Sequence, residues 1–98
     1  MTREQALRIL AANREKLRDF AVESVAIFGS VARNEATAAS DVDVLVEFKK
    51  DARVGLFGFV RVQRFLSGIL GCPVDLVTLD ALRQEIRQDV LREAVHAA

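Results

Sequence analysis

Three aspartates carry the clearest chemical signal in the sequence. Asp41 and Asp43 are separated by one residue, and Asp75 lies in a later apolar stretch. Side chains two apart on a strand leave the same face, so Asp41 and Asp43 would lie close together. Such carboxylates repel each other unless a cation lies between them, and their hard oxygens suit Mg²⁺. If the two stretches form neighbouring strands, Asp75 could complete a site for two metal ions.

A glycine and a serine follow an earlier apolar stretch and could hold phosphate. Gly29 and Ser30 interrupt the run that ends at Phe28. Glycine lets the backbone turn and a phosphate approach closely, while the serine offers a hydroxyl at the start of a helical turn. Each signal also has a plain structural interpretation, Gly-Ser as a capped turn and Asp-x-Asp as a solvated strand start. Together they favour metal-assisted phosphoryl chemistry.

The elements that must position these residues follow from hydrophobic spacing. Thr2 and Gln5 predict a capping box at the start of an amphipathic helix that extends towards Phe20. Strands are expected at residues 24–28, 42–48 and 74–79, and helices at residues 56–70 and after Asp80. Gly71 ends the middle helix. The order α-β-α-β-α-β-α predicts one α+β domain over residues 1–98, with a small mixed sheet of about three strands flanked by helices.

Two of these elements carry more detailed expectations. Around the strand at residues 42–48, one face should be formed by Val42, Val44, Val46 and Phe48, and the other by Asp41, Asp43, Leu45 and Glu47. In the last helix, one side should be formed by Leu82, Ile86, Val90 and Ala94. His96 is expected in a frayed tail.

Composition narrows the function classes. The 14 basic and 14 acidic residues cancel, so no net positive field would hold a long nucleic acid. The single cysteine excludes an intrachain disulfide. The charged N-terminal stretch lacks the apolar region of a signal peptide, and no apolar run is long enough to span a membrane. A cytoplasmic protein without a membrane partner is expected.

The motifs resemble those of a known superfamily. The stretch IFGSVARNEATAASDVDVLVEF is similar to the signature of DNA polymerase β-like nucleotidyltransferases, which is Gly-Ser, ten residues, then Asp-x-Asp. The likeness is greatest to the small MNT-type members, free-standing domains usually encoded beside a HEPN-domain partner as the antitoxin of a toxin–antitoxin pair. It continues through GCPVDLVT, which contains Asp75, and into DALRQEIRQDVLREAV, so it covers nearly the whole chain.

The resemblance implies roles for individual residues. Gly29 and Ser30 would hold the phosphates of a nucleotide, and Arg33 would either steady the triphosphate or be an exposed turn residue. The three aspartates would be the ligands of two Mg²⁺ ions, with Asp75 closest to the attacking hydroxyl. Asn34 stands where the family usually has glycine, and asparagine tolerates the left-handed conformation that such a turn needs.

The resemblance also implies a reaction and a partner. An acceptor hydroxyl would attack the α-phosphorus of an NTP and release pyrophosphate. ATP is the implied donor, and the implied acceptor is a protein hydroxyl such as a Tyr of the HEPN partner, whose AMPylation would silence the toxin within a hetero-oligomer.

The alternative function is a non-catalytic subunit that neutralises a partner by association alone. The helix predicted at residues 56–70 is apolar over more than one face. One stripe contains Leu56, Phe59, Val62, Leu66 and Ile69, and should pack on the sheet. Phe57, Val60 and Phe65 fall elsewhere, so they are either additional core or a surface for docking the partner.

Overall fold

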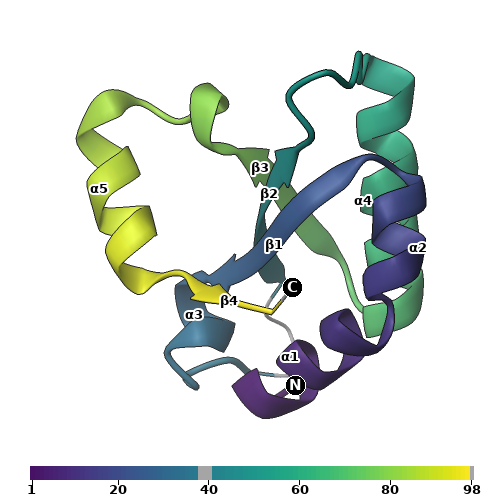
Figure 1. The fold of residues 1–98 in the computed structure, drawn as a ribbon. Helices are drawn as coiled ribbons and strands as arrows, with labels where there is room; N and C mark the ends of the chain where they lie inside the picture. Colours follow the sequence, from purple (N-terminus) through teal and green to yellow (C-terminus); the bar gives the residue numbers. More distant parts are fainter. Residues whose placement is uncertain (38–40, 98) are drawn as a thin grey trace.

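One four-stranded mixed sheet forms the centre of the fold in the computed structural model, which describes residues 1–37 and 41–97 (Figure 1). The helices are α1 (Arg3–Ala12), α2 (Arg14–Asp19), α3 (Gly29–Ala32), α4 (Leu56–Leu70) and α5 (Gln84–Glu93), with a 3₁₀ turn η1 at Leu79–Ala81. The strands are β1 (Val22–Phe28), β2 (Val42–Phe48), β3 (Val74–Thr78) and β4 (Val95–His96). The predicted α+β class is confirmed. Residues 38–40 of the predicted connection before Asp41 lie outside the described residues.

The strand order is β3-β2-β1-β4. β2 runs antiparallel to β1 and parallel to β3, and β4 pairs antiparallel with β1. The expectation of a frayed tail at His96 is therefore wrong. Val95 and His96 lie opposite Ile27 and Ala26 and add a fourth, short strand, so their backbone groups pair with the sheet.

The main core lies on one face of the sheet. The valines of β2 alternate inward as predicted and pack with Val25 and Ile27 of β1. Helices α1, α2 and α4 cover this face (Figure 1), and they contribute Leu10, Leu17, Val62 and Leu66 to the core. The apolar side chains of these helices and strands therefore bury one another, which is the chief stabilising term of the fold.

A smaller cluster lies on the opposite face of the sheet, on the side of α5 (Figure 1). Its buried members are Ala26, Leu45 and Val90. Leu45 is two residues after Asp43 along β2, so Asp43 belongs to the same thinly covered face. The sheet thus has one face devoted to packing and one that leaves room for polar chemistry.

Several predicted helix boundaries need correction. The first helix ends at Ala12, and Asn13, whose side-chain amide donates to the carbonyl of Ile9 (2.8 Å), separates it from α2. Asp80 lies in η1 and does not cap α5, which begins at Gln84 after Arg83. Ile86, predicted on the same side of that helix as Val90, is 45% exposed, whereas Val90 is buried.

Other local predictions are confirmed. Thr2 and Gln5 form a reciprocal capping box at the start of α1. Gly71 ends α4 in the left-handed conformation, with φ of 70°. Within the described residues, no helix has the length and apolar character needed to cross a membrane.

The two phenylalanines left open in α4 have different environments. Phe65 packs against the main core, and its ring centroid lies 5.3 Å from that of Phe20. Phe57 is 82% exposed. Leu56, which was predicted to face the sheet, is 74% exposed because it belongs to the first turn of the helix, beyond the packed stripe.

Candidate active site

The sheet register brings two of the predicted aspartates together. Asp43 of β2 and Asp75 of β3 are paired residues on adjacent parallel strands, so their side chains leave the same face side by side. Asp41 is exposed and precedes β2 by one residue. The three carboxylates therefore come from one end of β2 and from its neighbour, as the sequence predicted.

Gly29 lies against Asp43 from the other side. The last residue of β1, Phe28, is paired with Asp43, and the chain then turns at Gly29 with φ of 71°. A Cβ atom on Gly29 would lie 2.1 Å from Oδ2 of Asp43. Only a residue without a side chain permits this close approach and also adopts this φ without strain. Gly29 is thus required both for the turn and for the position of the carboxylate.

The electrostatics of Asp43 reflect its surroundings. Partial burial, together with the negative charges of Asp75, Asp41 and Glu93, raises the pKa of the Asp43 carboxyl above its ordinary value, and Arg33 only partly opposes this. Desolvation and like charges both disfavour an ionised carboxylate. The site therefore concentrates negative charge that a bound cation would relieve.

Arg33 is held beside the site by two carboxylates. Its Nε donates to Oε2 of Glu35 (3.2 Å), and its Nη1 donates to Oε1 of Glu93 in α5. The hydrogen bond that Arg33 donates to Glu35, together with the charge of Glu93, raises the pKa of the Arg33 guanidinium. Arg33 thus links α3 to α5 at the edge of the carboxylate cluster.

Glu93 was not singled out from the sequence. Its signal was available, because Glu93 is three residues after Val90 on α5 and so shares the side of the helix that packs on the sheet. What the sequence could not supply is the path of the chain that brings α5 beside α3.

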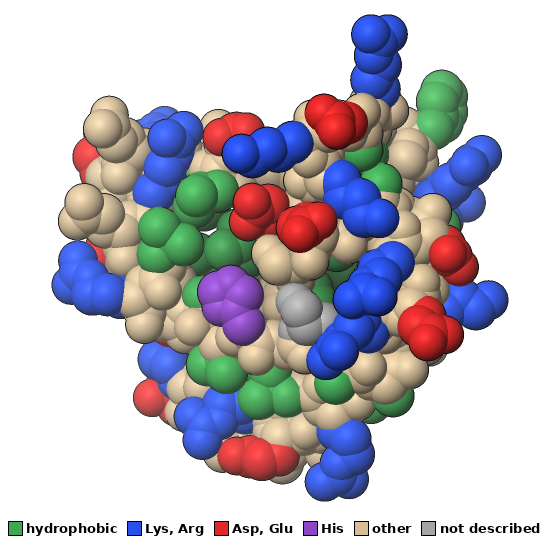
Figure 2. Space-filling model, in the orientation of Figure 1, with side chains coloured by type: hydrophobic (Ala, Val, Ile, Leu, Met, Phe, Trp, Pro, Cys, Tyr) green, Lys and Arg blue, Asp and Glu red, His purple; other side chains and the backbone are tan. Residues whose placement is uncertain are grey.

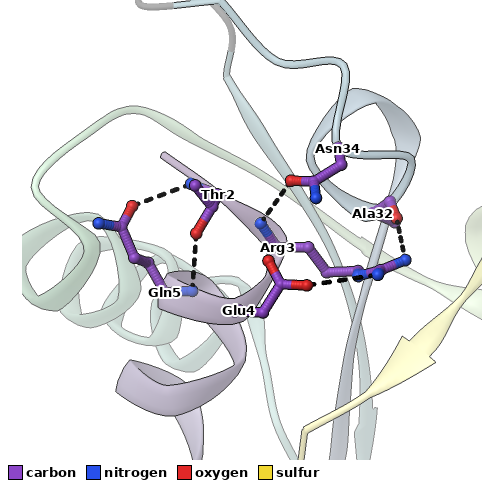
Figure 3. A network of polar contacts seen from close by, with 6 residues as sticks. All are labelled: Thr2, Arg3, Glu4, Gln5, Ala32 and Asn34. Atoms are coloured by element: carbon purple, nitrogen blue, oxygen red, sulfur yellow. Dashed lines mark hydrogen bonds and ion pairs between the residues drawn. The ribbon is translucent and has the colours of Figure 1, made fainter.

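The start of α1 braces the turn that follows Gly29 and Ser30 (Figure 3). The backbone N–H of Arg3 donates to Oδ1 of Asn34 (3.1 Å), and Nη1 of Arg3 donates to the carbonyl of Ala32 (3.4 Å). Asn34 has φ of 61°, the left-handed conformation predicted for it. Ser30 is half-buried in α3, and its carbonyl accepts from the N–H of Glu35 (2.8 Å).

The donor chemistry of the cluster suits a hard cation. Among the residues that the structure describes, no three His, Cys, Asp or Glu side chains form a metal-binding group by themselves. Mg²⁺ does not need such a group, since it commonly takes one or two carboxylates and completes its shell with substrate phosphates and water. Asp43 and Asp75 supply two carboxylates on one face, and Asp41 adds a third nearby. The residues fit a cation that arrives with a phosphorylated substrate.

Comparison with known proteins gives consistent matches. Residues 7–96 match the family model described as a nucleotidyltransferase domain. The chain is 39% identical over 97 residues to the protein adenylyltransferase MntA of Thermococcus cleftensis, covering 98% of this chain and 96% of that protein. A solved structure described as a candidate minimal nucleotidyltransferase superposes with a TM-score of 0.82 at 36% identity, covering 97% of this chain and 95% of the other.

A more distant match is to a chain in the complex of the tri-AMPylated HEPN toxin of Shewanella oneidensis with MNT antitoxin. The TM-score is 0.65 at 20% identity, and the alignment covers 94% of this chain and 71% of that chain. At this identity the likeness concerns the fold.

Proposed function

The chain belongs to the nucleotidyltransferase domain family, and on that premise we propose that it transfers AMP from ATP to a hydroxyl of a HEPN-domain partner protein. In this reaction the acceptor oxygen forms a bond to the α-phosphorus of ATP. The bond between the α-phosphorus and the oxygen that bridges it to the β-phosphorus breaks, and pyrophosphate leaves. The acceptor is a Tyr hydroxyl, and its modification inactivates the partner toxin.

One observation carries the proposal: Asp43 lies between Asp75 and Gly29 on the open face of the sheet. The turn at Gly29 gives phosphates access to backbone N–H groups next to a carboxylate cluster. A nucleotide in this position would place its reacting phosphorus beside Asp43. Neither a capped turn nor a solvated strand start needs this juxtaposition.

Each residue has a separate task in this proposal. Gly29 and Ser30 hold the β- and γ-phosphates, and Arg33 exchanges part of its pairing with Glu35 and Glu93 for the triphosphate. Asp75, exposed on the edge strand β3, lies nearest the incoming hydroxyl and accepts its proton. Asp41, Asp43 and Asp75 together would hold Mg²⁺, two ions when ATP is bound. When bound, Mg²⁺ supplies neutralisation of the carboxylate and phosphate charges.

The comparisons support the choice of donor and partner. A relative that matches this chain over nearly its whole length is named a protein adenylyltransferase. A chain of the same fold occurs in a complex with an AMPylated HEPN toxin. A hetero-oligomer with a HEPN-domain protein is therefore the proposed setting, and a long nucleic acid is not a proposed substrate because the chain has no net charge.

The direct test is transfer of label. The chain is incubated with ATP labelled at the α-phosphate, MgCl₂ and the product of the neighbouring gene, which the proposal identifies as a HEPN-domain protein. Label should appear on the partner protein, and mass spectrometry should assign it to a tyrosine. The double variant Asp41→Asn, Asp43→Asn should fold and lose transfer. Transfer that persists in this variant would contradict the assigned site, and label that stays with free nucleotide in the wild-type reaction would contradict the function.

A further inference from the structure

A groove lies on the same face of the sheet as the carboxylates. Its volume is about 460 Å³, and its apolar surface is formed by Ala26, Leu45, Leu79 and Leu91. Figure 2 shows hydrophobic side chains gathered around a hollow on the side of the molecule where α5 lies. Leu91 of α5 is 48% exposed at this position. The groove is therefore an open, partly apolar channel whose floor is formed by Ala26 and Leu45 of the smaller buried cluster, with Leu91 exposed at its side.

The groove begins where the carboxylate site ends. Leu45 follows Asp43 by two residues on the same face of β2, which corresponds to about 6.6 Å along the strand. Gly29 and Ser30 lie on the opposite side of Asp43, beyond the end of β1. Along the strand axis the order is therefore phosphate turn, carboxylates, groove.

This order determines which substrate the groove suits. Nucleotidyl transfer is an in-line displacement, so the attacking and leaving oxygens lie on opposite sides of the phosphorus. In the proposed function the leaving pyrophosphate lies towards Gly29 and Ser30. The acceptor hydroxyl must then approach from the other side of Asp43, which is the side of the groove.

We infer that this groove binds the acceptor segment of the partner protein, as an extended stretch with an apolar side chain two residues from the modified hydroxyl. The spacing follows from the geometry, since residues two apart in an extended chain are separated by about 6.6 Å and share a face. The acceptor residue would lie at Asp43 and Asp75 while the apolar residue contacts Leu45 and Leu91. Lys49 and Lys50 also line the groove, but the negative charges of Glu47 and Asp80, which line it too, offset theirs. Recognition therefore rests on the apolar surface.

The inference rests on the proposed function and can be tested with two matched variants. Leu91→Gln changes a residue of the groove, and Ile86→Gln changes an equally exposed leucine-sized residue of the same helix outside the groove. Glutamine is neutral and helix-favouring, so neither change should disturb α5. The initial rate of AMP transfer is measured while the concentrations of ATP and of the HEPN-domain protein are varied separately.

Leu91→Gln should raise the KM for the partner protein about tenfold, the loss expected when part of one leucine's burial is forfeited. The KM for ATP should stay within twofold of the wild-type value, and Ile86→Gln should change neither. A rise in the KM for ATP would show that the groove holds the nucleotide, and equal effects of the two variants would remove any special role for it. Either result overturns the inference while leaving the proposed transfer intact.

A binding measurement separates the groove from the chemistry. The affinity for the HEPN-domain protein is measured by calorimetry without ATP, so it does not depend on catalysis. If Leu91→Gln binds the partner more weakly and Ile86→Gln does not, the groove is supported as the binding site of the partner, even if no transfer occurs. If the wild-type chain binds the partner and both variants bind equally well, the inference is wrong. If the wild-type chain does not bind the partner, both the partner assignment and the occupant of the groove are wrong.

Discussion

Replacing Gly29 with alanine should inactivate the enzyme by moving Asp43. The added Cβ would lie 2.1 Å from Oδ2 of Asp43, far inside the normal contact distance. The carboxylate must then move by about 1 Å, and a misplacement of that size at a reacting centre costs about 100-fold in rate. We therefore expect kcat/KM for AMP transfer to fall about 100-fold, equivalent to about 2.7 kcal/mol of transition-state stabilisation.

The chain offers a control that isolates the effect of the backbone. Gly71 has nearly the same φ as Gly29, but a Cβ added there would meet nothing within 4 Å. Alanine at either position should therefore cost about 1–2 kcal/mol of folding free energy because of the left-handed conformation. For a chain of this length that lowers Tm by roughly 5–10 °C. Gly71→Ala should lose this stability and keep its activity.

A second control tests the effect of adding a methyl group without strain. Gly68 lies in α4 with open space around its Cα, so Gly68→Ala should stabilise the chain by up to about 1 kcal/mol. Thermal unfolding and transfer rates are measured for all three variants below their Tm. If Gly29→Ala keeps activity within threefold of Gly71→Ala, the contact between Gly29 and Asp43 does not position the carboxylate, and the reasoning fails.

Three further predictions follow from the site and the core. Folding raises the pKa of Asp43 above its ordinary value of 3.8, so the ionised carboxylate destabilises the folded chain at neutral pH. Asp43→Asn should therefore raise Tm at pH 7 in metal-free buffer. The gain should vanish below pH 3.8, where the carboxyl is protonated in both the folded and the unfolded chain. Arg33→Met removes an exposed ion-paired side chain, so it should change stability by less than about 1 kcal/mol while raising the KM for ATP several-fold. Phe65→Ala should cost about 2 kcal/mol of stability whereas Phe57→Ser costs almost none, which denaturant titration would show; similar losses would contradict the assignment of Phe65 to the core and Phe57 to the surface.

The parts of the fold that follow local rules were predictable from the sequence. The alternation of the valines of β2 with Asp43, Leu45 and Glu47 determines which residues enter the main core and which lie on the face of the site. The capping box at Thr2 and the left-handed Gly71 also depend only on neighbouring residues. In each case the determining interactions lie within one turn or one strand, so spacing is enough to identify them.

The features that were missed depend on contacts between distant segments. β4 is only two residues long, and Val95–His96 forms a strand because the chain returns beside β1. The pairing of Arg33 with Glu93 joins residues 60 apart in the sequence. The exposure of Leu56 depends on where α4 extends past the sheet, which hydrophobic spacing does not specify.

The arrangement around Asp43 argues that this part of the chain serves function and not stability. A carboxylate that is partly buried beside two other aspartates and Glu93 raises the free energy of the folded state. Arg33 is the nearby cation, yet its hydrogen bonds go to Glu35 and Glu93. A sequence selected only for folding would have an apolar or neutral residue at position 43. The neighbouring buried positions on the two faces of the same strand, Val44 and Leu45, are indeed apolar. The repulsion between these carboxylates is useful only if a bound cation and phosphate remove it. Ligands that relieve the repulsion then bind the site tightly.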